Sequence, residues 1–354
     1  MKRLIQLLPT HHRNDAVGAE ALVIERLLRA EGWRVDTYAE FIDPELRGST
    51  RPLDELDGVD ARGAVALYHF AVTSVVTQRL IGLDCPKVLR YHNVTPPEFY
   101  RPYDPGIAEI CEDSLRQVRQ LAEHVDLGIG VSEFNRLDLE RIGYRATRAV
   151  PFLFDPDRYA TEPDAATMNK LADRPLVLTV GRVVPNKAPD DFVRVAAAYA
   201  AGGYEPARFV FAGKRDALPA YARELDELIE SEQLAENQLL FTDEVGQADL
   251  VALYRSASLF LSLSRHEGFM VPLLESMLFE VPILALARAA VPETLGGAGC
   301  LFDDTDPERV AALVNTLLTD DRLRSDLVAG GRRRLDSLSI ERWAFVLRLL
   351  LEQL

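Results

Sequence analysis

The chain has 354 residues, of which 48% are hydrophobic and 27% charged, and its 55 acidic against 40 basic residues give a formal net charge of -15. This length predicts two globular domains, and the acidic balance argues against a nucleic-acid-binding protein, which usually presents a basic surface. The three cysteines, Cys85, Cys111 and Cys300, are far apart and indicate neither a disulfide framework nor a zinc site. We therefore expect a cytoplasmic protein.

The first half of the sequence alternates apolar runs with helical segments. The predicted strands are 3–8, 33–38, 64–68, 87–91 and 127–131, and the predicted helices are 15–31, 105–124 and a segment after Ser132. Asp15 is suited to cap the first helix, and Gly32 to end it. This βα alternation predicts a parallel, doubly wound sheet.

The same pattern restarts after a stretch rich in Pro, Asp, Thr and Ala at about 155–173, which is typical of a linker. Further strands are predicted at 176–180, 207–213, 238–241, 258–262 and 282–286. The expected fold is therefore α/β, with two facing Rossmann-like domains. In such an arrangement, ligands bind at the carboxyl ends of the strands, in the cleft between the domains.

These patterns divide the chain into residues 1–155, residues 156–335 and a C-terminal helix within 336–354. The helix carries an apolar stripe that includes Trp343, Val346 and Leu350. Core packing in the second domain and a peripheral contact at the inner face of a membrane are alternatives for this stripe. No run approaches the ~18 apolar residues that a membrane span needs.

The segment 262–277 combines a loop with the start of a helix. Glu267 lies in the loop, Pro272 suits the first helical turn, and Glu275 follows in the helix. A helix start binds anions and hydroxyls through its free N–H groups, and Gly268 lets a ligand approach the backbone closely. The two carboxylates are suited to accept hydrogen bonds from sugar and ribose hydroxyls. A helix merely capped by acidic residues is the alternative.

The segment 178–192 runs from a buried strand through Gly181, Arg182, a Pro-Asn turn and Lys187 into a helix. A guanidinium and an ammonium group at the carboxyl end of a strand can clamp a diphosphate. Isolated surface cations are the alternative, but the arrangement of strand, glycine, arginine, turn, lysine and helix favours the clamp.

Together the two segments resemble the retaining GT-B glycosyltransferases of glycosyltransferase family 4. The match lies in a G-R-x-x-x-x-K element at Gly181, Arg182 and Lys187, and in the glutamates Glu267 and Glu275, eight positions apart. The resemblance covers nearly all of 150–335 and is weaker before it. It implies that residues 1–155 bind the acceptor, that residues 156–335 bind the nucleotide-sugar donor, and that the C-terminal helix packs back against the first domain. It implies transfer of a hexosyl group from a nucleoside-diphosphate sugar to a glycan or lipid-linked saccharide, as in polysaccharide biosynthesis.

For the donor, the resemblance implies that Arg182 and Lys187 hold the diphosphate, Glu267 the sugar and Glu275 the ribose. The loop around Glu244 and Val245 is implied to lie at the edge of the nucleotide base. Family members often have a glycine where this chain has Asp243, directly before that loop. The implied donor-binding residues are Gly18, Gly181, Arg182, Lys187, Gly213, Glu244, Val245, Glu267, Gly268, Phe269, Met270, Val271 and Glu275. GDP-mannose and UDP-hexoses are the candidate donors, and the resemblance over the whole sequence slightly favours GDP-mannose.

In the first half, His92 matches the family histidine beside the reacting sugar. It joins Arg182, Lys187 and Glu267 as an implied catalytic residue. The implied acceptor-binding residues are His69, His92 and Asn93.

Retention of the anomeric configuration is implied by the resemblance. No D-x-D motif follows a strand in the manner of metal-dependent transferases, so we expect no required metal and no cofactor. A sugar-nucleotide epimerase, a sugar phosphorylase and a non-catalytic partner subunit that binds a nucleotide sugar are the alternatives. The oligomeric state is left open.

Overall fold

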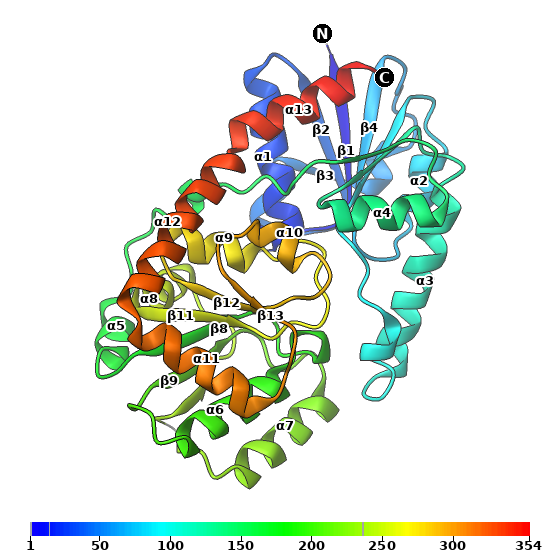
Figure 1. Cartoon of the computed structure of the whole chain (residues 1–354). Coiled ribbons are helices and arrows are strands. Elements are labelled where there is room, and N and C mark those ends of the chain that lie inside the picture. Colours follow the sequence, from blue (N-terminus) through cyan, green and yellow to red (C-terminus); the bar gives the residue numbers. More distant parts are fainter. Residues whose placement is uncertain (1, 14, 236) are drawn as a thin grey trace. The chain divides into compact units, whose positions relative to one another are not determined.

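The structure is a computed structural model that describes residues 2–13, 15–235 and 237–354. It divides into two compact units, which are described separately (Figure 1). Unit 1 contains the chain up to Glu98, Pro105–Asp155 and Leu338–Leu354, and unit 2 contains Phe99–Asp104 and Pro156–Ser337.

Unit 1 is built on a parallel sheet with the strand order β3-β2-β1-β4-β5-β6-β7. Its strands are β1 (Arg3–His11), β2 (Arg34–Ile42), β3 (Thr50–Pro52), β4 (Ala64–Phe70), β5 (Lys87–Tyr91), β6 (Leu127–Gly130) and β7 (Thr147–Ala149). Its helices are α1 (Ala16–Ala30), α2 (Val76–Ile81), α3 (Pro105–Leu121), α4 (Glu133–Ile142) and α13 (Ile340–Glu352). The expected cap of α1 is present, since Asp15 accepts a hydrogen bond from the N–H of Gly18. Ser132 likewise caps α4, by accepting one from the N–H of Asn135.

The core of unit 1 includes the C-terminal helix. Leu347 and Leu351 of α13 are buried together with Leu4 of β1 and Val23 of α1, and Trp343 packs against this cluster. Figure 1 shows α13 running beside α1. The apolar stripe of α13 is therefore used in packing, while Phe345, on another face of the helix, is exposed.

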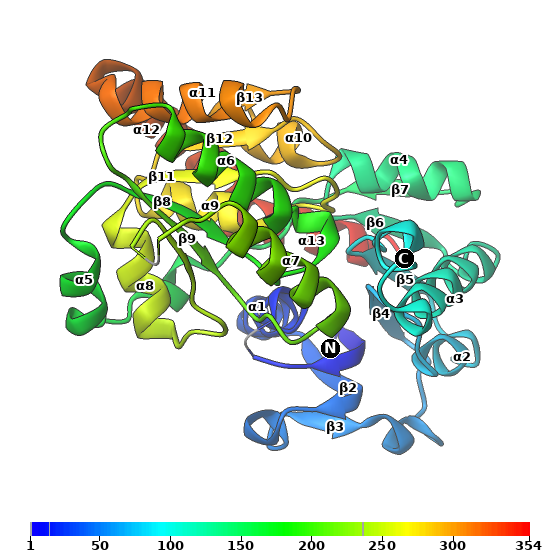
Figure 2. The ribbon, with the colours of Figure 1, turned by 90° about the horizontal axis from the view of Figure 1, so that it is seen from below.

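Unit 2 is built on a second parallel sheet, with the order β10-β9-β8-β11-β12-β13. Its strands are β8 (Leu176–Val180), β9 (Arg208–Ala212), β10 (Leu239–Phe241), β11 (Ala257–Ser262), β12 (Ile283–Leu286) and β13 (Cys300–Phe302). Its helices are α5 (Ala165–Leu171), α6 (Pro189–Ala201), α7 (Pro219–Ser231), α8 (Gln247–Ser256), α9 (Val271–Leu278), α10 (Val291–Leu295), α11 (Pro307–Thr319) and α12 (Asp321–Ser337). In Figure 2, α5 lies beside α8, and α6 beside α7.

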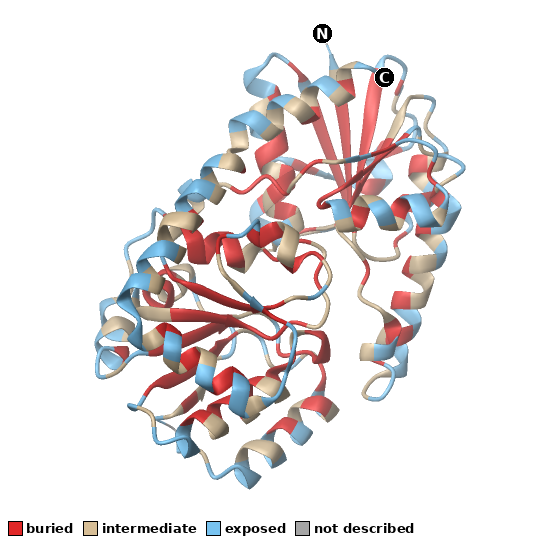
Figure 3. Ribbon diagram, in the orientation of Figure 1, coloured by how far each residue is buried: buried red, intermediate tan, exposed pale blue. Residues whose placement is uncertain are grey.

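The α/β fold with two parallel sheets is confirmed, and most of its buried residues lie in or against these sheets. The strands of both units are mostly buried, whereas the helices alternate buried and exposed faces (Figure 3). Such near-continuous burial is expected of parallel strands that are covered on both sides by helices.

Three features differ from the sequence-based expectation. The expected linker contains a helix, α5, which Asp164 caps by accepting a hydrogen bond from the N–H of Thr167. The strands β3, β7 and β13 have three residues each, too few to give a clear pattern. Residues 99–104, within the first predicted domain, group with unit 2.

No helix in the described part of the chain is both long and apolar enough to cross a membrane.

Candidate functional site

The strand order of unit 2 places two loops next to each other, at the point where the chain stops adding strands on one side of β8 and begins on the other. The chain runs outward from β8 through β9 to β10, and then returns to the other side of β8 as β11. Ligands of such sheets bind at the carboxyl ends of the strands at this reversal. The loop after β8 carries Gly181, Arg182 and Lys187, and the loop after β11 carries Glu267.

An ion pair joins these two loops, since the ammonium group of Lys187 bonds to Oε1 of Glu267. Both side chains are largely shielded, with 19% of Lys187 and 9% of Glu267 exposed. The stem of Lys187 passes over Gly181, where a Cβ would lie 3.6 Å from its Cδ. The structure thus brings together a cation and a carboxylate that the sequence analysis assigned to different parts of one donor.

Further bonds hold the loop of Glu267 against the turn of Lys187. The N–H of Arg265 donates to the carbonyl of Asn186 at 2.8 Å, and the amide of Asn186 donates to the carbonyl of His266 at 3.3 Å. The guanidinium of Arg265 also bonds to Asp190 and Asp191 at the start of α6, at 3.0 and 2.6 Å. A site held in this way can meet charge on a ligand with little rearrangement.

The glycine turns after β8 and β9 touch each other. A Cβ on Gly213 would lie 2.0 Å from the carbonyl oxygen of Gly181, so no larger residue fits without displacing the backbone. Gly213 also forms an isolated bridge with Asp243, which has a φ of 57°. This left-handed conformation favours glycine, although the chain has an aspartate there.

Helix α9 begins at Val271, after Met270 in a left-handed conformation (φ 74°). Glu275 lies inside this helix and is buried, with the hydroxyl of Tyr159 bonded to its Oε1 and that of Tyr254 to its Oε2. Burial raises the pKa of Glu275, although the two tyrosine hydrogen bonds oppose this rise. A ribose would have to share these oxygens with the tyrosines.

The segment 99–104 contacts the same region of unit 2. The hydroxyl of Tyr100 donates to Oδ1 of Asn186 at 3.4 Å, and the ring of Phe99 lies 6.3 Å from that of His266. The ring of Tyr103 lies 4.8 Å from that of Tyr221. Three aromatic residues from another part of the sequence therefore line the surroundings of the Lys187 turn.

The remaining predicted donor residues lie around these loops. Arg182 is exposed, and its guanidinium has no hydrogen bond or ion pair with the residues that the structure describes. Glu244 is exposed and Val245 half-buried in the loop between β10 and α8. Gly268 is half-buried, whereas Phe269 is buried, and its carbonyl accepts a hydrogen bond from the hydroxyl of Thr294.

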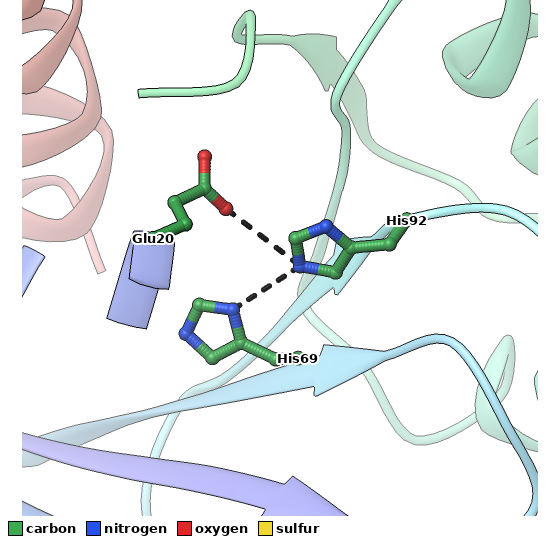
Figure 4. A group of neighbouring side chains, drawn as sticks. All are labelled: Glu20, His69 and His92. Carbon is green, nitrogen blue, oxygen red and sulfur yellow. Dashed lines mark hydrogen bonds and ion pairs between the residues drawn. The ribbon is translucent and has the colours of Figure 1, made fainter. Parts of the chain in front are cut away.

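Unit 1 contains a buried polar cluster at its own strand ends (Figure 4). Arg90 of β5 bonds to both carboxylate oxygens of Glu20 of α1, and both side chains are fully buried. The guanidinium holds the pKa of Glu20 at about 2, against the opposing effect of burial. Nε2 of His92 lies 3.6 Å from Oε2 of Glu20 and 3.2 Å from Nδ1 of His69.

The structure gives His69 a different place from the one expected of an acceptor-binding residue. Its side chain is fully buried, and its ring nitrogens bond to Gln6 and His92. Asn93, with a φ of 81°, donates to Oδ1 of Asn135 at 2.8 Å. Gly18 lies in the first turn of α1, where a Cβ would be 2.0 Å from the carbonyl oxygen of His12. A larger residue at position 18 would therefore push the backbone of His12 away from α1.

By proximity, one group in the described part of the chain could hold a metal ion, namely Glu20, His69 and His92. Its chemistry fits a cation poorly. Both oxygens of Glu20 already accept from Arg90, and Oε1 also accepts from the N–H of Leu153. A metal ion would have to displace these bonds beside a guanidinium group.

Several residues that shape both sites were not predicted from the sequence. They are Gln6, Glu20 and Arg90 in unit 1, and Tyr159, Asn186, Asp190, Asp191, Tyr254 and Arg265 in unit 2. Arg90 could have been found, because a charged residue inside the apolar run 87–91 needs a buried partner. The tyrosines carry no comparable signal.

Comparison with solved structures identifies the fold. The Anabaena protein HepE, solved in complex with UDP and glucose, matches with a TM-score of 0.77 over 99% of this chain and 100% of that one, at 16% identity. WaaG, a glycosyltransferase involved in lipopolysaccharide biosynthesis, matches with a TM-score of 0.70 over 97% of this chain and 99% of that one, also at 16% identity. The chain therefore has the GT-B fold of two Rossmann-like domains.

The sequence comparisons find a family model for the C-terminal part of the chain. Residues 162–334, just under half of the chain, match the model of the glycosyl transferases group 1 family. The serotype-specific mannosyltransferase WbdA of Escherichia coli is 34% identical over 102 residues, which are 29% of this chain and 12% of that protein.

A second relative is matched over a longer stretch. The GDP-mannose-dependent alpha-(1-6)-phosphatidylinositol monomannoside mannosyltransferase of Mycolicibacterium smegmatis is 29% identical over 191 residues, which are 50% of this chain and 48% of that protein. The match thus spans less than half the length of either relative.

Proposed function

We propose that this protein is a retaining glycosyltransferase of family 4, which transfers a hexosyl group from a nucleoside-diphosphate sugar to a hydroxyl group of a glycan or lipid-linked saccharide. The observation that carries the proposal is the pairing of Lys187 with Glu267 where the sheet of unit 2 reverses. A cation for the diphosphate and a carboxylate for the sugar hydroxyls lie there side by side. At the same edge, Gly213 packs directly against the backbone of Gly181.

The chemistry follows from the charge that develops in the reaction. As the bond between the anomeric carbon and the diphosphate oxygen breaks, its electron pair passes to the diphosphate. Arg182 and Lys187 stabilise that charge, and the helix start at Val271 contributes its N–H groups. The acceptor oxygen forms the new bond to the anomeric carbon from the same face, and a phosphate oxygen of the donor takes its proton. No metal is required in this scheme.

For the donor, we propose GDP-mannose first and a UDP-hexose second. Two relatives are named as mannosyltransferases, one of them GDP-mannose-dependent, and this favours mannose. The likeness to HepE extends to the fold alone, and so leaves UDP-sugars as the second choice.

A thermal-shift panel of GDP-mannose, UDP-glucose, UDP-galactose, GDP and UDP tests the donor. A ligand at ~100 times its dissociation constant adds about 2.7 kcal/mol of stability, and one of the nucleotide sugars should give this shift in the wild type but not in Lys187→Ala. Absence of a shift with every nucleotide sugar would remove the proposal.

The other functions are separated by product analysis with the donor thus identified. An epimerase converts the donor sugar without any acceptor, and a phosphorylase releases a sugar phosphate when phosphate is supplied. A non-catalytic subunit binds the donor and leaves it intact. The proposed transferase should release nucleoside diphosphate in proportion to an added saccharide acceptor, with an α-linked product from an α-linked donor.

A further inference from the structure

A run of hydrogen bonds in unit 1 determines which nitrogen of His69 carries a proton. The amide nitrogen of Gln6 donates to the carbonyl of Ala21 at 3.1 Å and lies 3.3 Å from Oγ1 of Thr37. A carbonyl can only accept, so this end of Gln6 is the NH₂ group. Its carbonyl end, Oε1, therefore faces Nε2 of His69 at 3.0 Å, and Nε2 must be the donor.

The same reasoning passes on to His92. His69 is fully buried, and burial keeps its pKa well below the usual histidine value, so it is neutral and its Nδ1 holds a lone pair. Nε2 of His92 lies 3.2 Å from that lone pair and must donate to it. Oε2 of Glu20, at 3.6 Å, is too far away for a hydrogen bond, but its carboxylate places negative charge on the same side. The lone pair of His69 and this charge both favour a proton on Nε2 of His92.

The other ring nitrogen of His92 is then an acceptor. In Figure 4, Nδ1 of His92 points away from Glu20 and His69. Nδ1 has no hydrogen-bonding partner among the described residues. It is not one of the buried atoms left without a partner, so it is accessible to a ligand. Burial lowers the pKa of His92 to about 4, which agrees with a neutral ring at physiological pH.

We propose that His69 is a positioning residue that, together with Glu20, holds the proton of His92 on Nε2, so that Nδ1 accepts a hydrogen bond from a hydroxyl group of the sugar substrate. This inference rests on the proposed glycosyl transfer and specifies what His92 recognises. A hydroxyl can donate to Nδ1, whereas an ionised phosphate has no proton to donate and is repelled by the lone pair.

The tautomer can be measured without any substrate. The chain has 6 histidines, so ¹⁵N labelling of histidine alone gives a readable spectrum, and His92→Asn assigns the signals. We expect His92 to show the neutral Nε2–H pattern from pH 5.5 to 8. An Nδ1–H pattern, or a charged ring within this range, would overturn the proposal. A shift of the His69 and His92 signals on addition of Zn²⁺ or Mn²⁺ would overturn it in favour of a metal site.

Activity tests the positioning role. His69→Leu removes the acceptor for Nε2–H and should lower kcat about 5- to 10-fold, the effect of losing one neutral hydrogen bond. His69→Asn places an amide oxygen near the position of Nδ1 and should recover most of that loss. Nucleotide affinity should be unchanged in both, because Arg182, Lys187 and Glu275, which are proposed to hold the diphosphate and the ribose, belong to unit 2.

Tyr68→Phe is the matched control, since Tyr68 adjoins His69 on β4, is also fully buried and points to the opposite face of the sheet. Equal loss in His69→Asn and His69→Leu would reduce His69 to a packing residue and overturn the proposal. Glycosyl transfer by a protein with the wrong His92 tautomer would overturn this inference alone. The expected tautomer without glycosyl transfer in any assay would instead overturn the proposed function.

Discussion

Lys187 and Glu267 are 80 positions apart in the sequence and form an ion pair across the two loops at the strand reversal of unit 2. The pair neutralises two groups that are each proposed to bind a different part of the donor. A bound diphosphate can share Lys187 with Glu267, because an ammonium group has three donors. The diphosphate and sugar contacts should therefore be energetically coupled.

We expect Lys187→Ala to lower turnover by at least ~10²-fold, as the loss of one charge-stabilising donor does in other enzymes. It also leaves the carboxylate of Glu267 shielded and without its cation. The measurement is the initial rate of nucleoside diphosphate release, with circular dichroism to verify folding. Arg332→Ala is the control, since it breaks an exposed ion pair with Glu280 in the same unit. A variant that keeps more than half of the activity would remove Lys187 from the site.

Gly213→Ala should abolish nucleotide binding while the unit stays folded. The added Cβ would lie 2.0 Å from the carbonyl oxygen of Gly181, so the turn of Arg182 and Lys187 must move. Gly48→Ala is the control, because nothing lies within 4 Å of a Cβ built there. Calorimetric titration with the nucleotide measures the loss. Unchanged affinity in Gly213→Ala would mean that the two turns do not form the site.

The buried carboxyl of Glu275 should make stability depend on pH. Its pKa is raised in the folded protein, chiefly by burial, so the stability that it contributes is present at low pH and is lost as pH rises through the folded-state pKa. Glu275→Gln cannot ionise and should therefore gain stability relative to the wild type as pH rises from about 4.5. Urea unfolding of both proteins at several pH values measures the difference. A difference that stays constant with pH contradicts this account.

EDTA should leave the transfer rate unchanged, because Arg182 and Lys187 are proposed to stabilise the leaving diphosphate in place of a metal ion. The rate is measured after dialysis against the chelator, and again after addition of Mg²⁺ or Mn²⁺. A rate that collapses with EDTA and returns with Mn²⁺ would show that the leaving group needs a metal.

Much of the fold could be predicted because its signals are local. The apolar run 87–91 coincides with β5, and the capping residue Asp15 and the stop signal Gly32 bracket α1. Helix α5 was missed since its Pro- and Asp-rich surroundings are typical of a linker, although Asp164 is an ordinary helix cap. The grouping of residues 99–104 with unit 2 depends on contacts with the distant residues Asn186 and Tyr221, which no local pattern encodes.

The sequence by itself determined the two parallel sheets, the loops that carry Lys187 and Glu267, and the resemblance to a family, because strand and helix periodicity and motif spacing are properties of neighbouring residues. Only the tertiary structure decided which side chains form hydrogen bonds with one another. Glu275 lies between two tyrosines from different segments, and His69 is enclosed between Gln6 and His92. Burial and hydrogen bonding join residues that are far apart in sequence, and these contacts determine which polar atoms remain available to a ligand.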